Sequence, residues 1–304
     1  MFLWAHNIII GFEGTNVDHP CVKKMLRYAR ENKIKGVILF KRNIYNHGQL
    51  KKLTHAFKEA KSDIEIAVDE EGKITAFKGV SRLFPLVGPV PSAFQMAQNH
   101  TPKQAYTLYR RYAHRLKELG ITMVFGPVVD LHSEDCPVIG KYERAFSSDP
   151  KKVIQYAKTF IQAFKDEGIK TVVKHYPGHG LSCLDTHSEI TNVTNTWQKK
   201  EAIPFQALSK DTPYIMMAHI IDDNVDKDVE ASLSQKHYDT AKALGYTYLV
   251  TDDLHMGAVQ IRHQPIIETM RRALKMGAIV IASNMPKASP TFVFTPDFDI
   301  PDKL

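Results

Sequence analysis

The 304-residue sequence predicts an α/β protein folded as a single-domain (β/α)8, TIM-like barrel. Eight short runs are rich in β-branched residues and almost entirely apolar, which is typical of strands buried on both faces. Helical patterns lie between most of these runs, as a barrel requires. A doubly wound open sheet would also alternate strands and helices, but the count of eight favours the barrel. The runs are residues 7–12, 36–40, 64–68, 121–129, 169–175, 214–219, 248–252 and 278–283.

Several of the intervening helices carry start and stop signals. Thr101-Pro102 and Asp149-Pro150 place a capping side chain directly before a proline at the first helical position. Glycines that are expected to end helices before the next strand are Gly120, Gly168, Gly245 and Gly277. The predicted helices are Val22–Asn32, Gln49–Lys61, Pro102–Leu119, Pro150–Glu167 and Ile267–Met276.

One catalytic domain is expected to span residues 1–304, because no repeat, low-complexity segment or linker divides the chain. Its last residues, 285–304, contain four prolines and are predicted to form a surface tail. The three cysteines form no CxxC pair and no disulfide framework, which indicates a reducing compartment and hence the cytoplasm. The N-terminal apolar run, interrupted by His6 and Asn7, is interpreted as a first strand and not as a signal peptide.

Composition also limits the partners of the protein. No apolar stretch approaches the roughly 20 residues needed to span a bilayer, so no membrane partner is expected. The net charge of +7 is spread over predicted helix faces. Because no basic cluster is interleaved with aromatic residues, a nucleic-acid partner is not expected either. Solvated helix surfaces account for the charge, and an acidic small substrate is the alternative explanation.

Polar residues follow nearly every apolar run at one end, whereas the opposite ends begin with glycine or with helix-ending segments. In a barrel, functional side chains gather at the carboxyl ends of the strands. The sequence therefore predicts a polar active site at the mouth of the barrel. The strand-end residues are Lys41, Asn43, Asp69, Asp130, Lys174, His175, His219, Asp252, Asp253 and Asn284.

The segment "TVVKHYPGHGLSCLDTHSEI" (171–190) combines a strand end with a glycine-containing loop. Lys174 and His175 end the fifth predicted strand, and Asp185 and His187 lie on the loop that follows. A carboxylate beside an imidazole favours the imidazolium and orients the ring. Such a pair can donate a proton and retrieve it near neutral pH, and the glycines would let the loop close over a substrate.

Metal binding is the main alternative for these histidines. His175 and His179 have a spacing seen in zinc sites, but Pro177-Gly178 prevents the helix that would place both rings on one face. No cysteine or carboxylate set completes a site, so neither a metal nor another cofactor is expected. An ordinary surface role for His179 or His187 alone stays open.

"VTDDLHM" (250–256) supplies a second group of ionisable residues. Successive strand residues point to opposite faces, so one aspartate of Asp252-Asp253 faces the cavity and the other is a candidate helix cap. A carboxylate in that position can attack carbon or stabilise a cation. Asp69 would be a further carboxylate at the mouth, able to accept hydrogen bonds from sugar hydroxyls. Together with a proton donor on a loop, these residues indicate glycoside chemistry.

These residues lie in motifs that resemble glycoside hydrolase family 3, and specifically its single-domain bacterial β-N-acetylglucosaminidases (β-hexosaminidases) of peptidoglycan recycling. "KHYPGHG" followed by "DTH" is similar to the subgroup's "KHFPGHG…DSH", which separates it from the β-glucosidases of the family. "TDDLHMGA" resembles the nucleophile motif "SDDLSMGA". "VILFKRNI", "FGPVVDL", "VIGKYERAF" and "MMAHI…ASLS" fit the remaining blocks in order, so the resemblance covers residues 5–285.

The resemblance implies roles for individual residues. Asp252 would be the nucleophile of a retaining enzyme and form a covalent glycosyl-enzyme, His187 the general acid/base, and Asp185 its carboxylate partner. The sugar-binding residues implied are Asp69, Arg144, Lys174 and His175. The substrates implied are N-acetylglucosaminyl-anhydromuramyl peptides. The enzyme would release the terminal N-acetylglucosamine from them in the cytoplasm. We expect a monomer acting on this small-molecule substrate.

The chain departs from the family pattern at one sugar-binding position. The family's "DQEGGRVQRF" corresponds to "DEEGKITAF" (69–77), so that its arginine falls at Ala76, or at Phe77 if no gap is placed.

Two other hypotheses about the function stay open. The first is another family 3 β-glycosidase, or a glycosidase that uses phosphate in place of water, because an Asp-His couple avoids two negative charges facing an incoming phosphate. The second is a degenerate protein that binds muropeptides without cleaving them.

Overall fold

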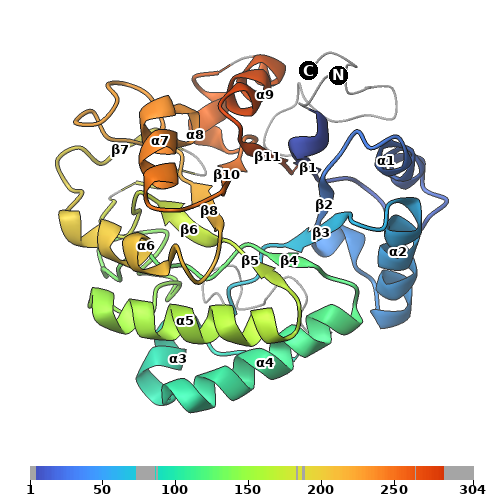
Figure 1. Ribbon diagram of the computed structural model, residues 1–304, viewed down its shortest axis with the longest axis horizontal. Helices are drawn as coiled ribbons and strands as arrows, with labels where there is room; N and C mark the ends of the chain where they lie inside the picture. Colours follow the sequence, from blue (N-terminus) through green and yellow to red (C-terminus); the bar gives the residue numbers. More distant parts are fainter. Residues whose placement is uncertain are drawn as a thin grey trace.

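Parallel strands gather at the centre of the molecule, and helices surround them (Figure 1). The computed structural model describes residues 5–72, 86, 88–182, 184–186, 189–263 and 265–283. The predicted tail, residues 285–304, lies outside these ranges. The central strands are β1 (Ile8–Ile10), β2 (Gly36–Leu39), β3 (Glu65–Val68), β4 (Met123–Val124), β5 (Lys170–Thr171), β6 (Val173–Tyr176), β8 (Tyr214–Met217), β10 (Tyr248–Asp253) and β11 (Ile279–Ala282).

The barrel closes through one extended segment, in which only Val172 separates β5 from β6. β5 pairs with β4 and β6 pairs with β8, both in parallel. β1 pairs with β2 on one side and with β11 on the other. An open sheet would leave two edge strands, whereas these pairings form a ring. The predicted (β/α)8, TIM-like barrel is therefore confirmed, and each of the eight predicted strands lies in it.

Helices follow the barrel strands along the chain. Those predicted from the sequence are present as α1 (Pro20–Arg30), α2 (His47–Ala60), α4 (Pro102–Glu118), α5 (Pro150–Asp166) and α9 (Ile266–Lys275). Shorter helices that were not predicted are α3 (Ala93–Asn99), α6 (Ala202–Leu208), α7 (Gln235–Ala243) and α8 (Gly257–Gln260). The strands β7 (Thr191–Asn192) and β9 (Ile220–Ile221) pair with each other outside the barrel.

Capping side chains begin the two longest helices, as the sequence predicts. The Thr101 hydroxyl accepts the Gln104 N–H in a capping box at the start of α4. The Asp149 carboxylate accepts the Lys151 N–H at the start of α5. Gly168 ends α5 with a φ of 75°, a conformation that other residues seldom adopt, and this allows the chain to turn directly into β5.

Apolar side chains fill the barrel on the inside and pack against the helices on the outside. The inner cluster consists of strand and strand-end residues alone, and Ile9, Val250 and Met216 are among its members. Ile8 and Ile10, one residue to either side of Ile9, belong to the outer cluster together with residues of the helices. This alternation explains why the strands read as continuous apolar runs. It also leaves the carboxyl ends of the strands as the place where polar residues can gather.

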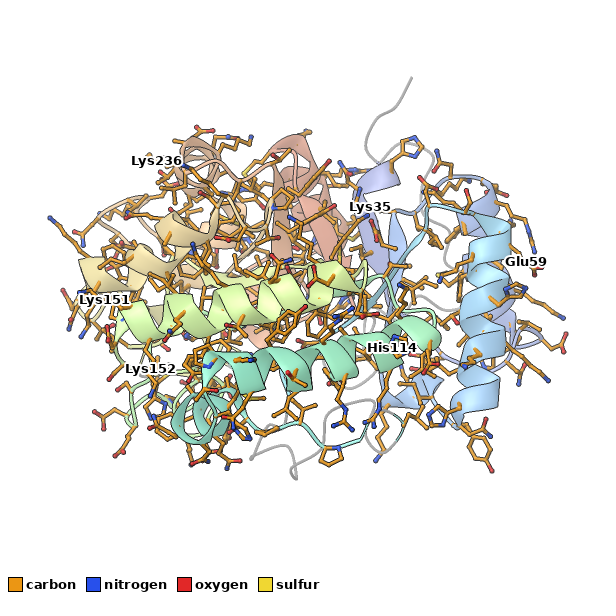
Figure 2. All side chains as sticks on the ribbon, turned by 60° about the horizontal axis from the view of Figure 1, so that its bottom comes forward. Lys35, Glu59, His114, Lys151, Lys152 and Lys236 are labelled. Carbon is orange, nitrogen blue, oxygen red and sulfur yellow. The ribbon has the colours of Figure 1, made fainter. Side chains whose placement is uncertain are left out.

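Ionisable side chains on the outer helices point away from the barrel (Figure 2). Labelled examples are Glu59 on α2, His114 on α4, Lys151 and Lys152 on α5, and Lys236 on α7. The labelled lysines of α5 and α7 thus lie on solvated helix faces, where the sequence places much of the basic charge. Within the ranges given above, no helix is both long enough and apolar enough to span a bilayer.

Candidate active site

A cavity opens at the carboxyl ends of the barrel strands. It encloses about 640 Å³ of space, counting the open solvent at its mouth. Inner-core residues such as Ile38, Phe125 and Met216 form its apolar part. Five of the residues predicted for the site line it together, although they come from four separate parts of the chain: Asp69, Arg144, Lys174, His175 and Asp252. The barrel geometry therefore brings the expected sugar-binding residues around the expected nucleophile.

Lys174 is buried at the centre of this group and contacts two carboxylates. Its Nζ lies 2.6 Å from Asp69 Oδ1 and also forms an ion pair with Glu71. Burial disfavours the ammonium, but Asp69 and Glu71 more than compensate and raise the pKa of Lys174 above its usual value. Lys174 is therefore a fixed positive charge, and it holds the Asp69 carboxylate at the cavity.

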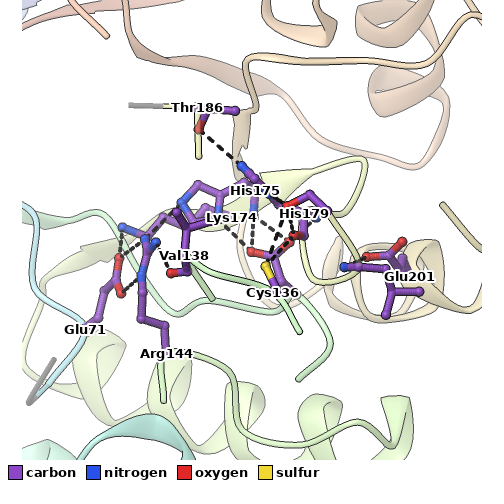
Figure 3. Close-up of polar contacts among 12 residues, drawn as sticks. Glu71, Cys136, Val138, Arg144, Lys174, His175, His179, Thr186 and Glu201 are labelled. Atoms are coloured by element: carbon purple, nitrogen blue, oxygen red, sulfur yellow. Dashed lines mark hydrogen bonds and ion pairs between the residues drawn. The ribbon is translucent and has the colours of Figure 1, made fainter. Parts of the chain in front are cut away.

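Arg144 and Glu71 form a second buried pair beside Lys174 (Figure 3). Arg144 also donates to the Val138 carbonyl at 3.0 Å, which fixes the guanidinium on the loop that precedes α5. Burial opposes both charges, yet Arg144 and Lys174 hold the pKa of the Glu71 carboxyl well below its usual value. Glu71 thus joins two cations of the site into one rigid unit.

His175 lies between Arg144 and a buried aspartate. Its Nδ1 is 2.7 Å from Asp130 Oδ2, and its Nε2 is 3.2 Å from Arg144 Nη2. Because the guanidinium can only donate, Nε2 must accept, and the ring proton is assigned to Nδ1. Asp130 also accepts the backbone N–H groups of His175 and His179. The imidazole is therefore fixed in orientation.

The two aspartates at the end of β10 have different surroundings. Asp252 is half-buried, lines the cavity, and its Oδ1 accepts the Asp253 N–H at 2.8 Å. The Asp253 carboxylate instead accepts the N–H groups of His255 and Ser283 and contacts the Ser283 hydroxyl. Asp253 also lines the cavity, but its carboxylate is engaged by the neighbouring loops. It does not cap a helix as expected, because the N-cap of α8 is Met256. Asp252 is therefore the better candidate for a carboxylate presented to a substrate.

His219, two residues after β8, supports the end of β10 at Asp252-Asp253. Its Nδ1 is 2.7 Å from the Ser232 hydroxyl, and its Nε2 is 3.0 Å from the Asp253 carbonyl oxygen. Because a carbonyl only accepts, Nε2 carries the proton. This strand-end histidine therefore fixes the backbone that follows Asp252 and does not itself line the cavity.

The two glycines of "PGHG" permit close packing in the loop after β6. A Cβ at Gly178, where φ is 133°, would lie 2.6 Å from Glu201 Cβ. A Cβ at Gly180 would lie 2.1 Å from the Leu131 carbonyl oxygen. Any larger residue would push this loop away from the barrel. Closure of the loop over a substrate, expected from the same glycines, stays a prediction.

The expected acid/base couple is described only in part. Asp185 is half-buried, and Thr186, the residue after it, is buried and lines the cavity. His187 lies outside the described residues. The segment carrying the couple therefore reaches the same cavity as Asp252, while the placement of the His187 ring stays a prediction.

Comparison with known proteins decides the family. The profile of the glycosyl hydrolase family 3 N terminal domain matches residues 20–291. The chain belongs to glycoside hydrolase family 3. It is 32% identical over 298 residues to a beta-hexosaminidase from Alkalilimnicola ehrlichii, and the match covers 93% of this chain and 82% of that protein. The predicted enzyme class, a glycoside hydrolase, is confirmed.

Solved structures of family 3 enzymes share the barrel. A glycoside hydrolase family 3 beta-N-acetylglucosaminidase from Paenibacillus sp. superposes with a TM-score of 0.82 at 25% identity, covering 93% of this chain and 55% of that one. This chain thus spans about half the length of that enzyme. NagZ from Neisseria gonorrhoeae, in complex with N-trifluoroacetyl-D-glucosamine, superposes with a TM-score of 0.78 at 25% identity, covering 93% of this chain and 82% of that one.

Sequence reasoning missed several residues of this family 3 site. Glu71 follows Asp69 by two positions, but nothing in "DEEG" indicates which carboxylate contacts the cations. Asp130 was recognised as a strand-end residue, although its pairing with His175 was not. His179 and Thr186 contact each other through side chains seven positions apart. Only the folded chain reveals these pairings.

The ring nitrogens of the two motif histidines are all engaged with protein atoms. Those of His175 contact Asp130 and Arg144, and those of His179 contact Ser182 and Thr186. Their ring centroids are 5.9 Å apart, in an edge-to-face arrangement. Neither ring offers a nitrogen to a shared ion, so the hydrogen bonds give these histidines a positioning role in the family 3 barrel.

Proposed function

We propose that this family 3 enzyme is a retaining, exo-acting β-N-acetylglucosaminidase that releases terminal N-acetylglucosamine from N-acetylglucosaminyl-anhydromuramyl peptides. The observation that carries the proposal is the position of Asp252, whose carboxylate faces the cavity that Asp69, Arg144, Lys174 and His175 also line. A carboxylate beside fixed hydrogen-bonding groups suits attack on the anomeric carbon of a bound sugar. We assign the enzyme to the cytoplasm, a proposal supported by the free, buried thiols of Cys21 and Cys136.

The first chemical step forms a bond from an Asp252 carboxylate oxygen to the anomeric carbon. The bond from that carbon to the leaving oxygen breaks, and His187 protonates the leaving oxygen. In the second step His187 takes a proton from water, whose oxygen displaces Asp252 and releases N-acetylglucosamine. Asp185 would orient the His187 ring and favour its protonated form.

Binding of the terminal sugar falls to the charged group around Lys174. The Asp69 carboxylate, held by Lys174, would accept hydrogen bonds from sugar hydroxyls, and Arg144, oriented by His175, would supply further polar contacts. The activities of the relatives, a beta-hexosaminidase and a beta-N-acetylglucosaminidase, support an N-acetylhexosaminide substrate. The N-trifluoroacetyl-D-glucosamine complex of a solved neighbour supports the same sugar.

Charge favours water over phosphate as the acceptor. Among the described residues that line the cavity are three with carboxylates, Asp69, Asp252 and Asp253, and two cations, Arg144 and Lys174. Glu71 and Asp130 add two more carboxylates directly behind them. An incoming phosphate dianion would be repelled by this excess of negative charge. Hydrolysis is therefore proposed over phosphorolysis.

A chromogenic N-acetylglucosaminide and an anhydromuropeptide test the proposal. The wild type should release N-acetylglucosamine first as the β-anomer, seen by NMR, because two displacements restore the starting configuration. Asp252→Asn should lose at least the roughly 10²–10⁴-fold that one catalytic group typically contributes. Release of the α-anomer would contradict retention, and an active Asp252→Asn enzyme would contradict the assigned nucleophile.

The two alternatives give different results in the same assay. A phosphate-using enzyme would accelerate with added phosphate and yield a sugar 1-phosphate, whereas the proposed hydrolase should be insensitive to phosphate and yield the free sugar. A degenerate binding protein would bind the anhydromuropeptide in calorimetry without releasing any sugar from it.

A further inference from the structure

Thr186 is the point at which the segment carrying Asp185 is attached to the barrel. Its side chain is buried, lines the cavity, and has its Oγ1 3.2 Å from His179 Nε2. Its carbonyl oxygen accepts the Ala258 N–H at 3.2 Å. Thr186 is therefore attached on two sides, once through its backbone and once through its side chain, whose contact is drawn in Figure 3.

The His179 ring is held between two hydroxyl groups, and its tautomer is assigned from their contacts. The Ser182 hydroxyl is assigned as donor to the His179 carbonyl oxygen at 2.9 Å, which leaves its oxygen to accept from His179 Nδ1 at 2.5 Å. With the proton on Nδ1, Nε2 can only accept, and the Thr186 hydroxyl must be its donor. Burial lowers the pKa of His179 to about 4, which keeps the ring in this neutral form at physiological pH.

Both attachments of Thr186 lead directly to the reacting centre. The His179 N–H donates at 2.8 Å to Asp130, the carboxylate that also binds the His175 ring. Ala258 belongs to the short helix α8, which begins five residues after Asp252. The Thr186 contacts thus join the loop to the sugar-binding side of the cavity and to the segment that follows the nucleophile.

We propose that His179 is a positioning residue that accepts the Thr186 hydroxyl and thereby holds the segment carrying Asp185 in place relative to Asp252. The inference rests on the proposed function, because it assumes that the residues on either side of Thr186 transfer the proton. His179 does not touch the substrate in this scheme. A small displacement of a proton donor is enough to slow the chemical step without weakening binding.

Two pairs of substitutions separate the hydrogen bond from the bulk of the side chains. Thr186→Val removes the hydroxyl at nearly constant volume, and Thr186→Ser restores it. His179→Gln places an amide oxygen where Nε2 accepts, whereas His179→Asn keeps a donor toward Ser182 but is too short to reach Thr186. Thr240→Val is the control for the chemical change, because that hydroxyl is exposed and bonds only to its own helix.

The decisive measurement compares leaving groups. For an N-acetylglucosaminide with a poor leaving group, kcat/KM of Thr186→Val and His179→Asn should fall about 10- to 100-fold, as expected for a misplaced catalytic group. For a dinitrophenyl glycoside, whose departure needs no proton, kcat/KM should stay close to that of the wild type. Thr186→Ser and His179→Gln should recover most of the lost rate, and KM should change little throughout.

Each outcome decides the proposal. Equal losses on both leaving groups would mean a general structural defect, and no loss on either would mean that the bond is dispensable; both results overturn the positioning role. Failure of Thr186→Ser to recover the rate would overturn it as well. A wild type that cleaves no N-acetylglucosaminide would overturn the proposed function, and the inference with it. Thermal unfolding of every variant identifies any that fail to fold, in which case the remaining pair decides.

Discussion

Glu71 binds Arg144 through both of its carboxylate oxygens, with Oε2 2.7 Å from Nε and Oε1 2.8 Å from Nη2. The same carboxylate also forms an ion pair with Lys174, so one buried anion neutralises two buried cations. Bidentate geometry of this kind is specific to arginine, which is why lysine could not replace Arg144 without loss. The sugar-binding side of the cavity therefore depends on a residue that need not touch the sugar.

Glu71→Gln should destabilise the protein and weaken substrate binding. Removing the anion leaves Arg144 and Lys174 buried without full compensation, which typically costs about 3–5 kcal/mol. Urea denaturation measures the loss, and a raised KM should accompany it. Glu268→Gln is the matched control, because Glu268 pairs with Arg271 on an exposed helix face and should contribute at most about 1 kcal/mol. Equal effects of the two substitutions would contradict the role of Glu71.

Asp130→Asn should slow the reaction by reversing the tautomer of His175. An amide placed at Asp130 can donate to Nδ1, which moves the ring proton to Nε2, where it opposes the donor of Arg144. We expect kcat/KM to fall about 10- to 100-fold with the fold retained. Asp166→Asn on the exposed face of α5 provides the control. NMR of the His175 ring nitrogens should show the change of tautomer, and an unchanged spectrum would contradict the argument.

The barrel could be predicted from the sequence because its strands are buried on both faces and read as apolar runs. The first and last residues of the strands were less predictable. The run 121–129 contains only the two-residue β4, since regular pairing ends before Gly126-Pro127. Helices α6 and α7 were missed for local reasons. The first has seven residues and includes Pro204, and the second reads "QKHYDTAKA", whose polar residues conceal its buried face.

The site residues that end strands could be predicted from the sequence, whereas those on loops could not. Asp69, Lys174, His175 and Asp252 end strands, so topology alone brings them together. Arg144 lies in the long loop before α5, and only the resemblance to a family identified it. The contact of Glu71 with Arg144 joins two loops that are distant in the sequence. The contact of Thr186 with His179 joins two points of one loop that folds back on itself. No local pattern of residue types encodes such distances.

Stability should fall as the pH decreases from about 6.5 to about 4, because His237 is buried as the neutral ring. Burial lowers its pKa to about 4, and within the described chain its Nε2 has no hydrogen-bond partner. Between these pH values the unfolded imidazole binds a proton that the folded one does not. The group's contribution, on the order of 3 kcal/mol, is complete above pH 6.5 and lost toward pH 4.

The free energy of unfolding, measured at several pH values in urea, checks this prediction. His237→Phe should flatten the slope, and His55→Phe on the exposed face of α2 should leave it as in the wild type. His179, whose pKa is lowered to the same value, should preserve part of the slope in His237→Phe. A variant with an unaltered slope would show that His237 does not titrate as described.

Glu201 should give stability the opposite pH dependence to that of His237. Its carboxylate accepts the N–H groups of Leu181 and Gln198, but burial, with a smaller contribution from Asp130, raises its pKa to about 7. Between about pH 4.5 and 7 the folded protein retains a proton that the unfolded chain has lost, so the stability from this group falls as the pH rises.

The variant Glu201→Gln tests this prediction, because its side chain cannot ionise. Its stability relative to the wild type should therefore increase by about 2 kcal/mol between pH 5.5 and pH 8. Any constant cost of the amide cancels in this difference, and Glu118→Gln, on the exposed end of α4, should show none. A difference that stays constant with pH would mean that Glu201 is already ionised at pH 5.5, and that the backbone N–H groups outweigh its burial.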